Sequence, residues 1–177
     1  MALRKIRIQG EEILSKRAKE IPEITPRIKE LAADMIETMY DAEGVGLAGP
    51  QVGILKRIVV IDVSPEQDSP MVLINPRIVK AEGSQTGWEG CLSVPGKSGQ
   101  VTRPMNVTAE YTDLDGNAGT LEAEGFLARA VCHELDHLDG HLYVEKVEGR
   151  LYDNSELRDD SEEEDAADKV SPVGENK

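Results

Sequence analysis

The chain has 177 residues, of which 39% are hydrophobic and 31% charged, and this composition suits one soluble domain with its own core. A formal net charge of −14 argues against direct binding to nucleic acid. No stretch approaches the ~20 apolar residues of a membrane span, and residues 1–7 lack the apolar segment of a secretory signal. Two cysteines are too few for a disulfide framework, so we expect a cytoplasmic protein without membrane contact.

The negative charge is concentrated at the C-terminus. Residues 153–177 contain ten acidic and three basic residues, so this segment carries −7, half the net charge of the chain. It has almost no large apolar side chain beyond Leu157, and burial cannot offset the entropy lost on ordering it. We therefore predict a folded domain over residues 1–152 and a disordered acidic tail over residues 153–177.

The hydrophobic pattern predicts helices at both ends of this domain and strands between them. Thr25 as N-cap, Pro26 at the first helical position and Gly44 after the end delimit a helix whose apolar residues recur every three or four positions. Asn-Pro at 75–76 interrupts one strand, and residues 115–117 form a hairpin turn. The predicted elements are a helical turn over 11–18, helix 25–43, strands 57–63, 71–81, 105–114 and 120–124, and helix 125–140.

The order of these elements indicates the fold class. Helices and strands are segregated and do not alternate as in βαβ units, which favours an α+β fold with mixed or antiparallel strands packed around the second helix. The glycine-rich segment 44–53 is expected to have irregular backbone that can approach a ligand closely, and a second glycine-rich segment, 87–96, is expected to be strand-like around Cys91. The first is not a phosphate-binding loop, because no Gly-Lys-Ser/Thr follows it.

Residues 133–137, His-Glu-Leu-Asp-His, lie inside the second predicted helix. His133 and His137 are four positions apart, so they lie about 40° apart around the helix and ~6 Å apart along it, and both rings can contact one divalent metal ion. Glu134 then lies near a water molecule on that ion, where a carboxylate can act as general base. Asp136 faces away and is expected to pair with a base such as Arg103. The motif predicts a catalytic metal site that needs a third protein ligand.

Four residues could supply this third ligand. Cys91 is flanked by glycine in a segment that can approach a metal, whereas Cys132 points about 100° away from the adjacent histidine. His141 continues the four-residue spacing, but a glycine ends the helix before it, and Glu156 has the spacing of a thermolysin-like ligand. Spacing favours Cys91 and leaves two other classes open: a zinc peptidase with a distal carboxylate ligand, and a structural zinc module completed by Cys132 or His141.

Three segments in this order resemble the signature motifs of the bacterial peptide deformylase family. They are residues 44–51 (Gly-Val-Gly-Leu-Ala-Gly-Pro-Gln), 89–93 (Glu-Gly-Cys-Leu-Ser) and 133–137. The resemblance extends from the N-terminus to about Tyr152, and three ordered motifs are far more specific than the histidine motif alone. Residues 1–152 would then form a deformylase-like catalytic domain.

The resemblance implies a metal-dependent hydrolase that removes the formyl group from N-formylmethionyl nascent peptides, releases formate, and meets its substrate near the ribosomal exit tunnel. One divalent ion per chain is expected, natively Fe(II), with Zn, Ni or Co able to replace it. Glu134 would transfer protons, while the Gln51 amide and the Leu92 backbone N–H would donate to the tetrahedral oxyanion. The implied metal ligands are Cys91, His133 and His137.

The substrate-binding residues follow from the same motifs. Backbone groups around Val45 and Gly46 are expected to pair with the peptide as an added strand. Glu89 is expected to accept a hydrogen bond from a ligand histidine or to position its loop, and the alternative is a surface carboxylate. Trp88 is expected at the rim of the methionine pocket. The predicted substrate-binding residues are Val45, Gly46, Glu89, Gly90, Phe126 and Ala130.

The chain departs from the family pattern at two places. Gly49 stands where the family usually has alanine, from which we expect local flexibility without loss of function. The acidic tail replaces the basic or helical C-terminal extension common in one branch of the family. Docking through the tail therefore does not carry over from the family.

Overall fold

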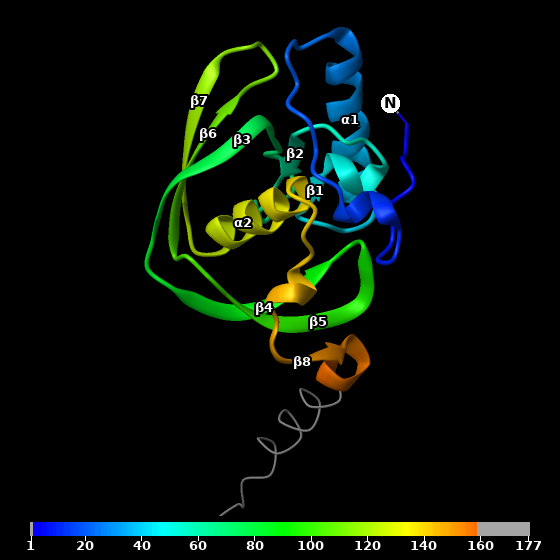
Figure 1. Cartoon of the computed structure of the whole chain (residues 1–177), viewed down its shortest axis with the longest axis vertical. Coiled ribbons are helices and arrows are strands. Elements are labelled where there is room, and N and C mark those ends of the chain that lie inside the picture. Colours follow the sequence, from blue (N-terminus) through cyan, green and yellow to red (C-terminus); the bar gives the residue numbers. More distant parts are fainter. Residues whose placement is uncertain (1, 159–177) are drawn as a thin grey trace, which may run out of the picture.

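The computed structural model describes residues 2–158, and in it one helix lies between two antiparallel sheets (Figure 1). The strands are β1 Gly46–Ala48, β2 Ile58–Ile61, β3 Met71–Glu82, β4 Gln85–Cys91, β5 Val94–Arg103, β6 Asn106–Thr112, β7 Ala118–Glu124 and β8 Glu148–Asp153. The α-helices are α1 Pro26–Asp41 and α2 Phe126–Leu138, and the short 3-10 helices are η1 Glu12–Ser15, η2 Gly49–Val52 and η3 Tyr143–Lys146.

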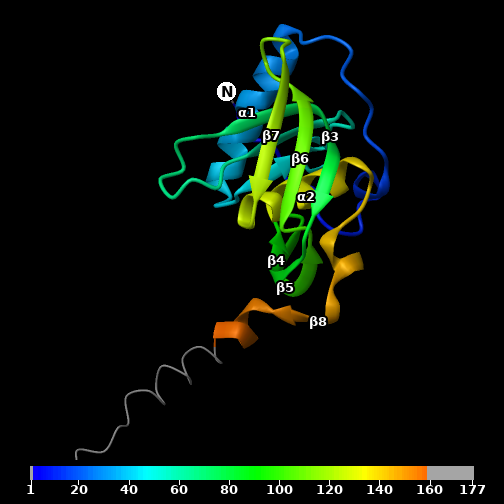
Figure 2. The ribbon, with the colours of Figure 1, turned by 90° about the vertical axis from the view of Figure 1, so that its left-hand side faces the viewer.

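The larger sheet has the strand order β1-β2-β3-β6-β7, and the smaller has the order β4-β5-β8. Every pairing between these strands is antiparallel. An isolated bridge between Lys19 and Lys56 is parallel. The predicted α+β class is confirmed, and of the two strand arrangements that the sequence left open the sheets adopt the antiparallel one. Figure 2 shows the larger sheet and the smaller sheet on opposite sides of α2.

Helix α1 begins and ends where the sequence predicts. The Thr25 hydroxyl accepts a hydrogen bond from the Ile28 backbone N–H at 3.4 Å, and Pro26 occupies the first helical position. Its apolar stripe faces the first strands of the larger sheet, where Met35 and Met39 are fully buried. Burial of this stripe stabilises the helix more than its intrinsic propensity does.

Helix α2 is the element around which the sheets pack. Its apolar side chains, such as Val131 and Leu138, are fully buried in a cluster with the larger sheet. Gly140 follows the helix at φ +80°, and a Cβ there would lie 2.6 Å from the carbonyl oxygen of Ser15. Only glycine fits this position, so the chain turns sharply away and leaves the other face of α2 toward β4 and β5.

The Asn-Pro sequence interrupts β3 less than predicted. Asn75 has a φ of +50°, and the register with β6 shifts between Ile74 and Arg77, as in a β-bulge. The Asn75 side chain bonds to both the N–H and the carbonyl of Ile21 at 2.8 Å. These bonds hold the bulge, and the strand continues to Glu82.

The C-terminal boundary differs from the prediction. The expected domain end at Tyr152 falls inside β8, and residues 154–158 are helical. The Glu156 carboxylate accepts a hydrogen bond from the Asp153 backbone N–H at 3.0 Å, which caps this turn. The prediction of disorder is therefore wrong for residues 153–158, and the rest of the predicted tail, 159–177, lies outside the described residues.

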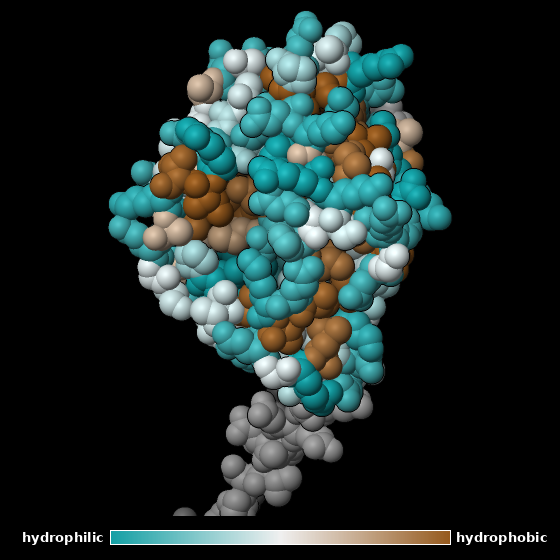
Figure 3. Space-filling model, in the orientation of Figure 1, coloured by the Kyte–Doolittle hydropathy of each residue, from teal (hydrophilic) through white to brown (hydrophobic). Residues whose placement is uncertain are grey.

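The surface is mostly polar. On the face seen in Figure 3, hydrophobic residues form separate patches surrounded by hydrophilic ones. Among residues 2–158, no helix has the length and apolar character needed to cross a membrane.

Candidate metal centre and active site

Three side chains from two distant parts of the chain converge beside α2. His133 and His137 come from the helix, and Cys91 comes from the end of β4. Their ligand atoms all lie within 4.8 Å of one another, and Cys91 Sγ is 3.4 Å from His137 Nε2. Ligand atoms on one tetrahedral ion are about 3.3–3.7 Å apart. The set therefore fits a single divalent ion.

The pKa values of the two histidines are shifted in opposite directions. Burial alone would lower the pKa of His133, but hydrogen bonds to Cys91 and Glu89 and the charge of Glu134 raise that pKa to about 10. Burial and the neighbouring His133 hold the pKa of His137 well below its usual value, so its imidazole is neutral, as a metal ligand must be. A thiol, two imidazoles and surrounding carboxylates suit a borderline metal such as iron or zinc.

The other candidates for the third ligand lie elsewhere. Cys132 is buried on another face of α2, and its burial raises the pKa of the thiol. His141 Nδ1 contacts Glu145 at 2.9 Å on the surface, and Glu156 pairs with Arg150. Within residues 2–158 the cluster of possible metal ligands contains none of these three. The geometry thus gives no support to the peptidase or structural-zinc alternatives.

Glu89 is buried and contacts His133, one of the three candidate metal ligands. Its Oε1 is 2.8 Å from His133 Nδ1, which directs Nε2 of that ring toward Cys91. Arg103 donates to both Glu89 oxygens at 2.9 Å, and Arg129 donates to Oε2 at 2.7 Å. Burial would raise the pKa of Glu89, but the bonds from Arg103 and His133 lower it to about 2. Glu89 lines the pocket, yet both its oxygens are occupied, so it orients the histidine and is not free to bind substrate.

Arg103 links this network to the surface. It also donates to Asp136 at 2.6 Å, the pairing that the sequence predicted. Two arginines at least nine-tenths buried, around one buried carboxylate, form a rigid support, because removing any member would leave a buried charge unpaired.

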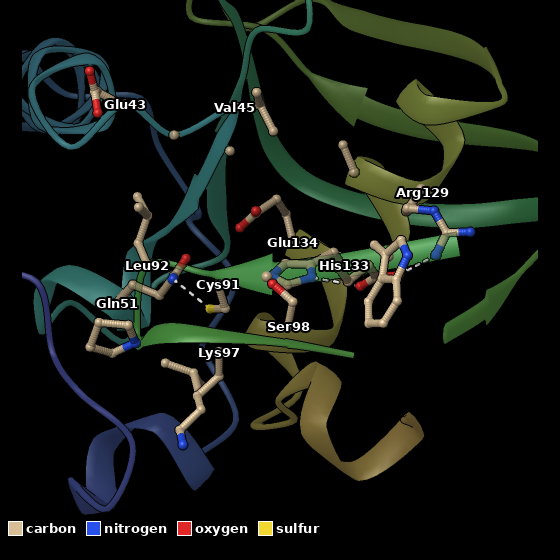
Figure 4. Close-up of a pocket in the computed structure, with 18 of the residues that line it drawn as sticks. Glu43, Val45, Gln51, Cys91, Leu92, Lys97, Ser98, Arg129, His133 and Glu134 are labelled. Atoms are coloured by element: carbon tan, nitrogen blue, oxygen red, sulfur yellow. Dashed lines mark hydrogen bonds and ion pairs between the residues drawn. The ribbon is translucent and has the colours of Figure 1, made fainter. Parts of the chain in front are cut away.

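The Glu134 carboxylate points into the pocket (Figure 4), and one of its oxygens makes no hydrogen bond to the described residues. It is buried, and its Oε2 atom has no hydrogen-bond partner within residues 2–158. Burial raises the pKa of Glu134 to about 7. A carboxyl group of this pKa can both accept and return a proton near neutral pH.

Gln51 has its side-chain amide fixed in orientation. Its Oε1 accepts from the Ala48 backbone N–H at 2.9 Å, and its Nε2 donates to Ser93 Oγ at 3.1 Å. The same Nε2 donates to Cys91 Sγ at 3.5 Å, and Figure 4 shows this contact. The amide N–H₂ is thereby directed toward the metal cluster. Leu92, the second predicted oxyanion donor, lies on the same pocket wall.

Ser93 is a residue whose function the sequence prediction missed. It is fully buried, accepts from Gln51, and its backbone N–H donates to Cys91 Sγ at 3.4 Å. The N-terminal segment supports both partners, since the Arg7 N–H donates to the Gln51 carbonyl at 2.7 Å and the Gln9 N–H to the Ser93 carbonyl at 2.8 Å. The signal in the sequence was its place as the last residue of the second motif, two positions after the cysteine.

A cavity of about 470 Å³ opens in front of these groups. Val45, Phe126 and Trp88 are exposed at its apolar rim, and Ala130 lies deeper. Its lining includes all six predicted substrate-binding residues: Val45, Gly46, Glu89, Gly90, Phe126 and Ala130. It also includes residues that the prediction did not name, among them Lys97, Ser98, Arg129 and Asn154.

Two glycines of the first motif are closely packed. Strand β1 is the edge of the larger sheet, and a Cβ on Gly46 would lie 2.4 Å from Glu134 Oε1. Gly49 is buried, and a Cβ there would lie 2.6 Å from the carbonyl oxygen of Lys56. The backbone therefore packs against the position that a side chain at residue 49 would occupy, and the local flexibility expected at Gly49 stays a prediction.

Comparisons with known proteins agree with this site. A family model described as polypeptide deformylase matches residues 3–151. A peptide deformylase of Agathobacter rectalis is 62% identical over 153 residues, 86% of this chain and 95% of the relative. The crystal structure of the Thermotoga maritima enzyme matches with a TM-score of 0.80 at 37% identity, over 83% of this chain and 99% of that chain. The Synechococcus elongatus enzyme, solved in complex with actinonin, matches with a TM-score of 0.79 at 40% identity, over 95% of this chain and 91% of that chain.

The family match covers all three sequence motifs and every residue of the metal cluster. The chain therefore belongs to the peptide deformylase family, metal-dependent hydrolases that remove the formyl group from N-formylmethionyl nascent peptides.

Proposed function

We propose that deformylation in this chain uses Glu134 for proton transfer and Gln51 and Leu92 to bind the oxyanion, with Cys91, His133 and His137 as the metal ligands. The observation that carries this assignment is the convergence of three ligand atoms within 4.8 Å beside a buried carboxylate that has an unpartnered oxygen. When bound, the metal acts as a Lewis acid and lowers the pKa of water at the site. We propose Fe(II) as the native ion, with Zn, Ni or Co as functional substitutes.

Glu134 handles the proton at both stages of the reaction. Its carboxylate takes a proton from the attacking water, whose oxygen forms a bond to the formyl carbon. It then gives that proton to the amine nitrogen as the carbon–nitrogen bond breaks, so the products are formate and a free N-terminus. A pKa of about 7 for Glu134 supports both transfers.

Gln51 and Leu92 act on the charge that develops on the formyl oxygen. The Gln51 amide does not need to reorganise during the reaction, because Ala48 and Ser93 already fix it. Donors fixed in this way stabilise the transition state more than the substrate.

The substrate is expected to lie along β1. This strand pairs with β2 on one side only, and on that side the Val45 carbonyl accepts a hydrogen bond from the Asp62 N–H at 2.8 Å. The other side of the strand, around Gly46, can pair with an extended peptide. Phe126 and Ala130 provide apolar surface for the methionine side chain. Glu89 has a positioning role, through His133.

Nascent formylated chains are the substrate, so we infer a cytoplasmic enzyme that works close to the ribosomal exit tunnel. The net charge of −14 favours contact with basic ribosomal proteins over contact with ribosomal RNA.

The test is formate release from a formyl-Met-Ala-Ser peptide by protein purified without oxygen, with metal content measured on the same sample. The acetyl analogue is the control substrate. Formate release that requires Cys91, His133 and His137, with loss of metal in each alanine variant, is the expected result. A Cys91→Ala protein that keeps its metal and its activity would contradict the ligand assignment.

A further inference from the structure

The C-terminal strand contributes a residue to the active-site pocket. Asn154 directly follows β8 and lines the same cavity as Cys91 and Glu134. Nothing in the three family motifs extends this far along the chain. The pocket is therefore closed on one side by a segment whose sequence alone indicates only an acidic tail.

Asn154 is held by contacts with the strand beside it. Ser98 pairs with Tyr152 in the β5–β8 register, and the Ser98 hydroxyl donates to Asn154 Oδ1 at 2.6 Å. Asp153 forms an ion pair with Lys97. In Figure 4 the Ser98 side chain points from β5 into the pocket, whereas Lys97 points the opposite way. The oxygen of the Asn154 amide is thus occupied and its position is fixed.

The nitrogen of the same amide is available. Asn154 Nδ2 carries two N–H donors, and it has no hydrogen-bond partner within residues 2–158. The residue is half-buried, while its neighbours Asp153 and Ser155 are exposed, so Asn154 lies at the mouth of the pocket and not at its floor. A donor at the mouth matches the acceptor that every peptide presents there, a main-chain carbonyl oxygen.

We propose that Asn154 is a specificity-determining residue that donates a hydrogen bond to a main-chain carbonyl of the substrate beyond its second residue. The inference rests on the proposed function. The reacting formyl group lies against Glu134 and Cys91, and the first side chain fills the apolar part of the pocket. The peptide then leaves along the free edge of β1 and passes the opposite wall formed by Ser98 and Asn154. Asn154 therefore makes the enzyme prefer longer peptides over a formylated dipeptide.

The experiment compares two substrates with three full-chain variants. The substrates are formyl-Met-Ala amide, which ends before the mouth, and formyl-Met-Ala-Ser-Ala amide, which passes it. Asn154→Ala removes the donor. Asn154→Asp keeps an acceptor for Ser98 but cannot donate, and Ser155→Ala alters an exposed neighbour as the matched control. Metal content and melting temperature are measured for each variant.

Both Asn154 variants are expected to raise KM about 3–10-fold for the tetrapeptide, the effect of one lost hydrogen bond, with kcat and the dipeptide KM unchanged. Ser155→Ala should match the unmodified chain. Equal KM changes for both peptides, no change for either, or an unaffected Asn154→Asp protein would overturn the proposal. Failure of the unmodified chain to release formate from either peptide would instead refute the proposed function itself.

Discussion

The contact between Gly46 and Glu134 leaves no room for a side chain at position 46. A Cβ on Gly46 would lie 2.4 Å from Glu134 Oε1, 2.8 Å from Cδ and 2.9 Å from Cγ. Non-bonded heavy atoms are comfortable at about 3.5 Å, so Gly46→Ala requires a displacement of about 1 Å. The question is which of the two partners moves.

We expect the Glu134 side chain to move, and not the Gly46 backbone. Gly46 pairs with Ile61 in the register of β1 and β2, and this region of the sheet is fully buried. The Glu134 carboxylate has an unpartnered Oε2 within residues 2–158, so fewer interactions hold it in place. A displacement of about 1 Å in a catalytic group can cost ~10²-fold in rate. We therefore expect Gly46→Ala to lower kcat by about 10²-fold, with metal content retained and KM little changed.

The assay is the kcat and KM of formate release, together with metal content and melting temperature. Gly119→Ala is the matched control, because its Cβ would lie 2.6 Å from Tyr111 Cζ in the β6–β7 hairpin, an overlap of similar size far from the site. This control should lower the melting temperature and keep kcat. Combining Gly46→Ala with Glu134→Gln should reduce activity no further than Glu134→Gln alone, since both changes remove the same function.

Two results would refute this reasoning. A rise in KM with unchanged kcat would mean that Gly46 acts by pairing with the substrate and that Glu134 is not displaced. Losses that multiply in the double variant would mean that the two residues act independently.

Four other outcomes follow from the site. Glu134→Gln should retain metal while activity falls by at least ~10²-fold, and near-normal turnover in the metallated protein would exclude proton transfer by Glu134. Gln51→Leu should lower kcat by roughly 10²–10³ with a modest change in KM, whereas an effect on KM alone would indicate substrate positioning. Ser93→Ala should lower kcat about 3–10-fold through the freed Gln51 amide, with unchanged metal content, and an unaffected kcat would remove its positioning role. The Fe(II) protein should lose activity in air faster than the nickel protein, through oxidation of iron or Cys91, and equal lifetimes would argue against that route.

Local geometry explains which parts of the site were predictable. The spacing of His133 and His137 on one face is set by the helix itself, and the caps at Thr25 and Gly140 define helix ends without reference to the rest of the fold. The sequence therefore predicted both long helices and the orientation of the two histidines. The antiparallel hairpin of β6 and β7 was predictable for the same reason, since its turn residues lie between its strands.

Contacts between distant residues were not predictable from spacing. Cys91 lies 46 positions from His137, and from the residues alone it was one of four candidates until the family resemblance singled it out. The buried ion pairs of Glu89 with Arg103 and Arg129 were even less predictable from the sequence. A charged residue in the sequence is expected at the surface, and only the fold reveals that these three are buried together.

The C-terminal segment shows why net charge did not predict the structure of residues 153–158. Asp153 and Glu156 were counted among the acids of a solvated tail, but Asp153 pairs with Lys97, and Glu156 pairs with Arg150 and caps a helical turn. Aromatic contacts add to this order, since the Arg150 guanidinium lies 3.7 Å from the centre of the Tyr152 ring, and that ring packs edge-on against Trp88 at the pocket rim. Net charge predicts disorder only where opposite charges and apolar surface are out of reach. Trp88 from β4 and Lys97 from β5 bring both within reach of residues 148–158, and the pocket gains a wall as a result.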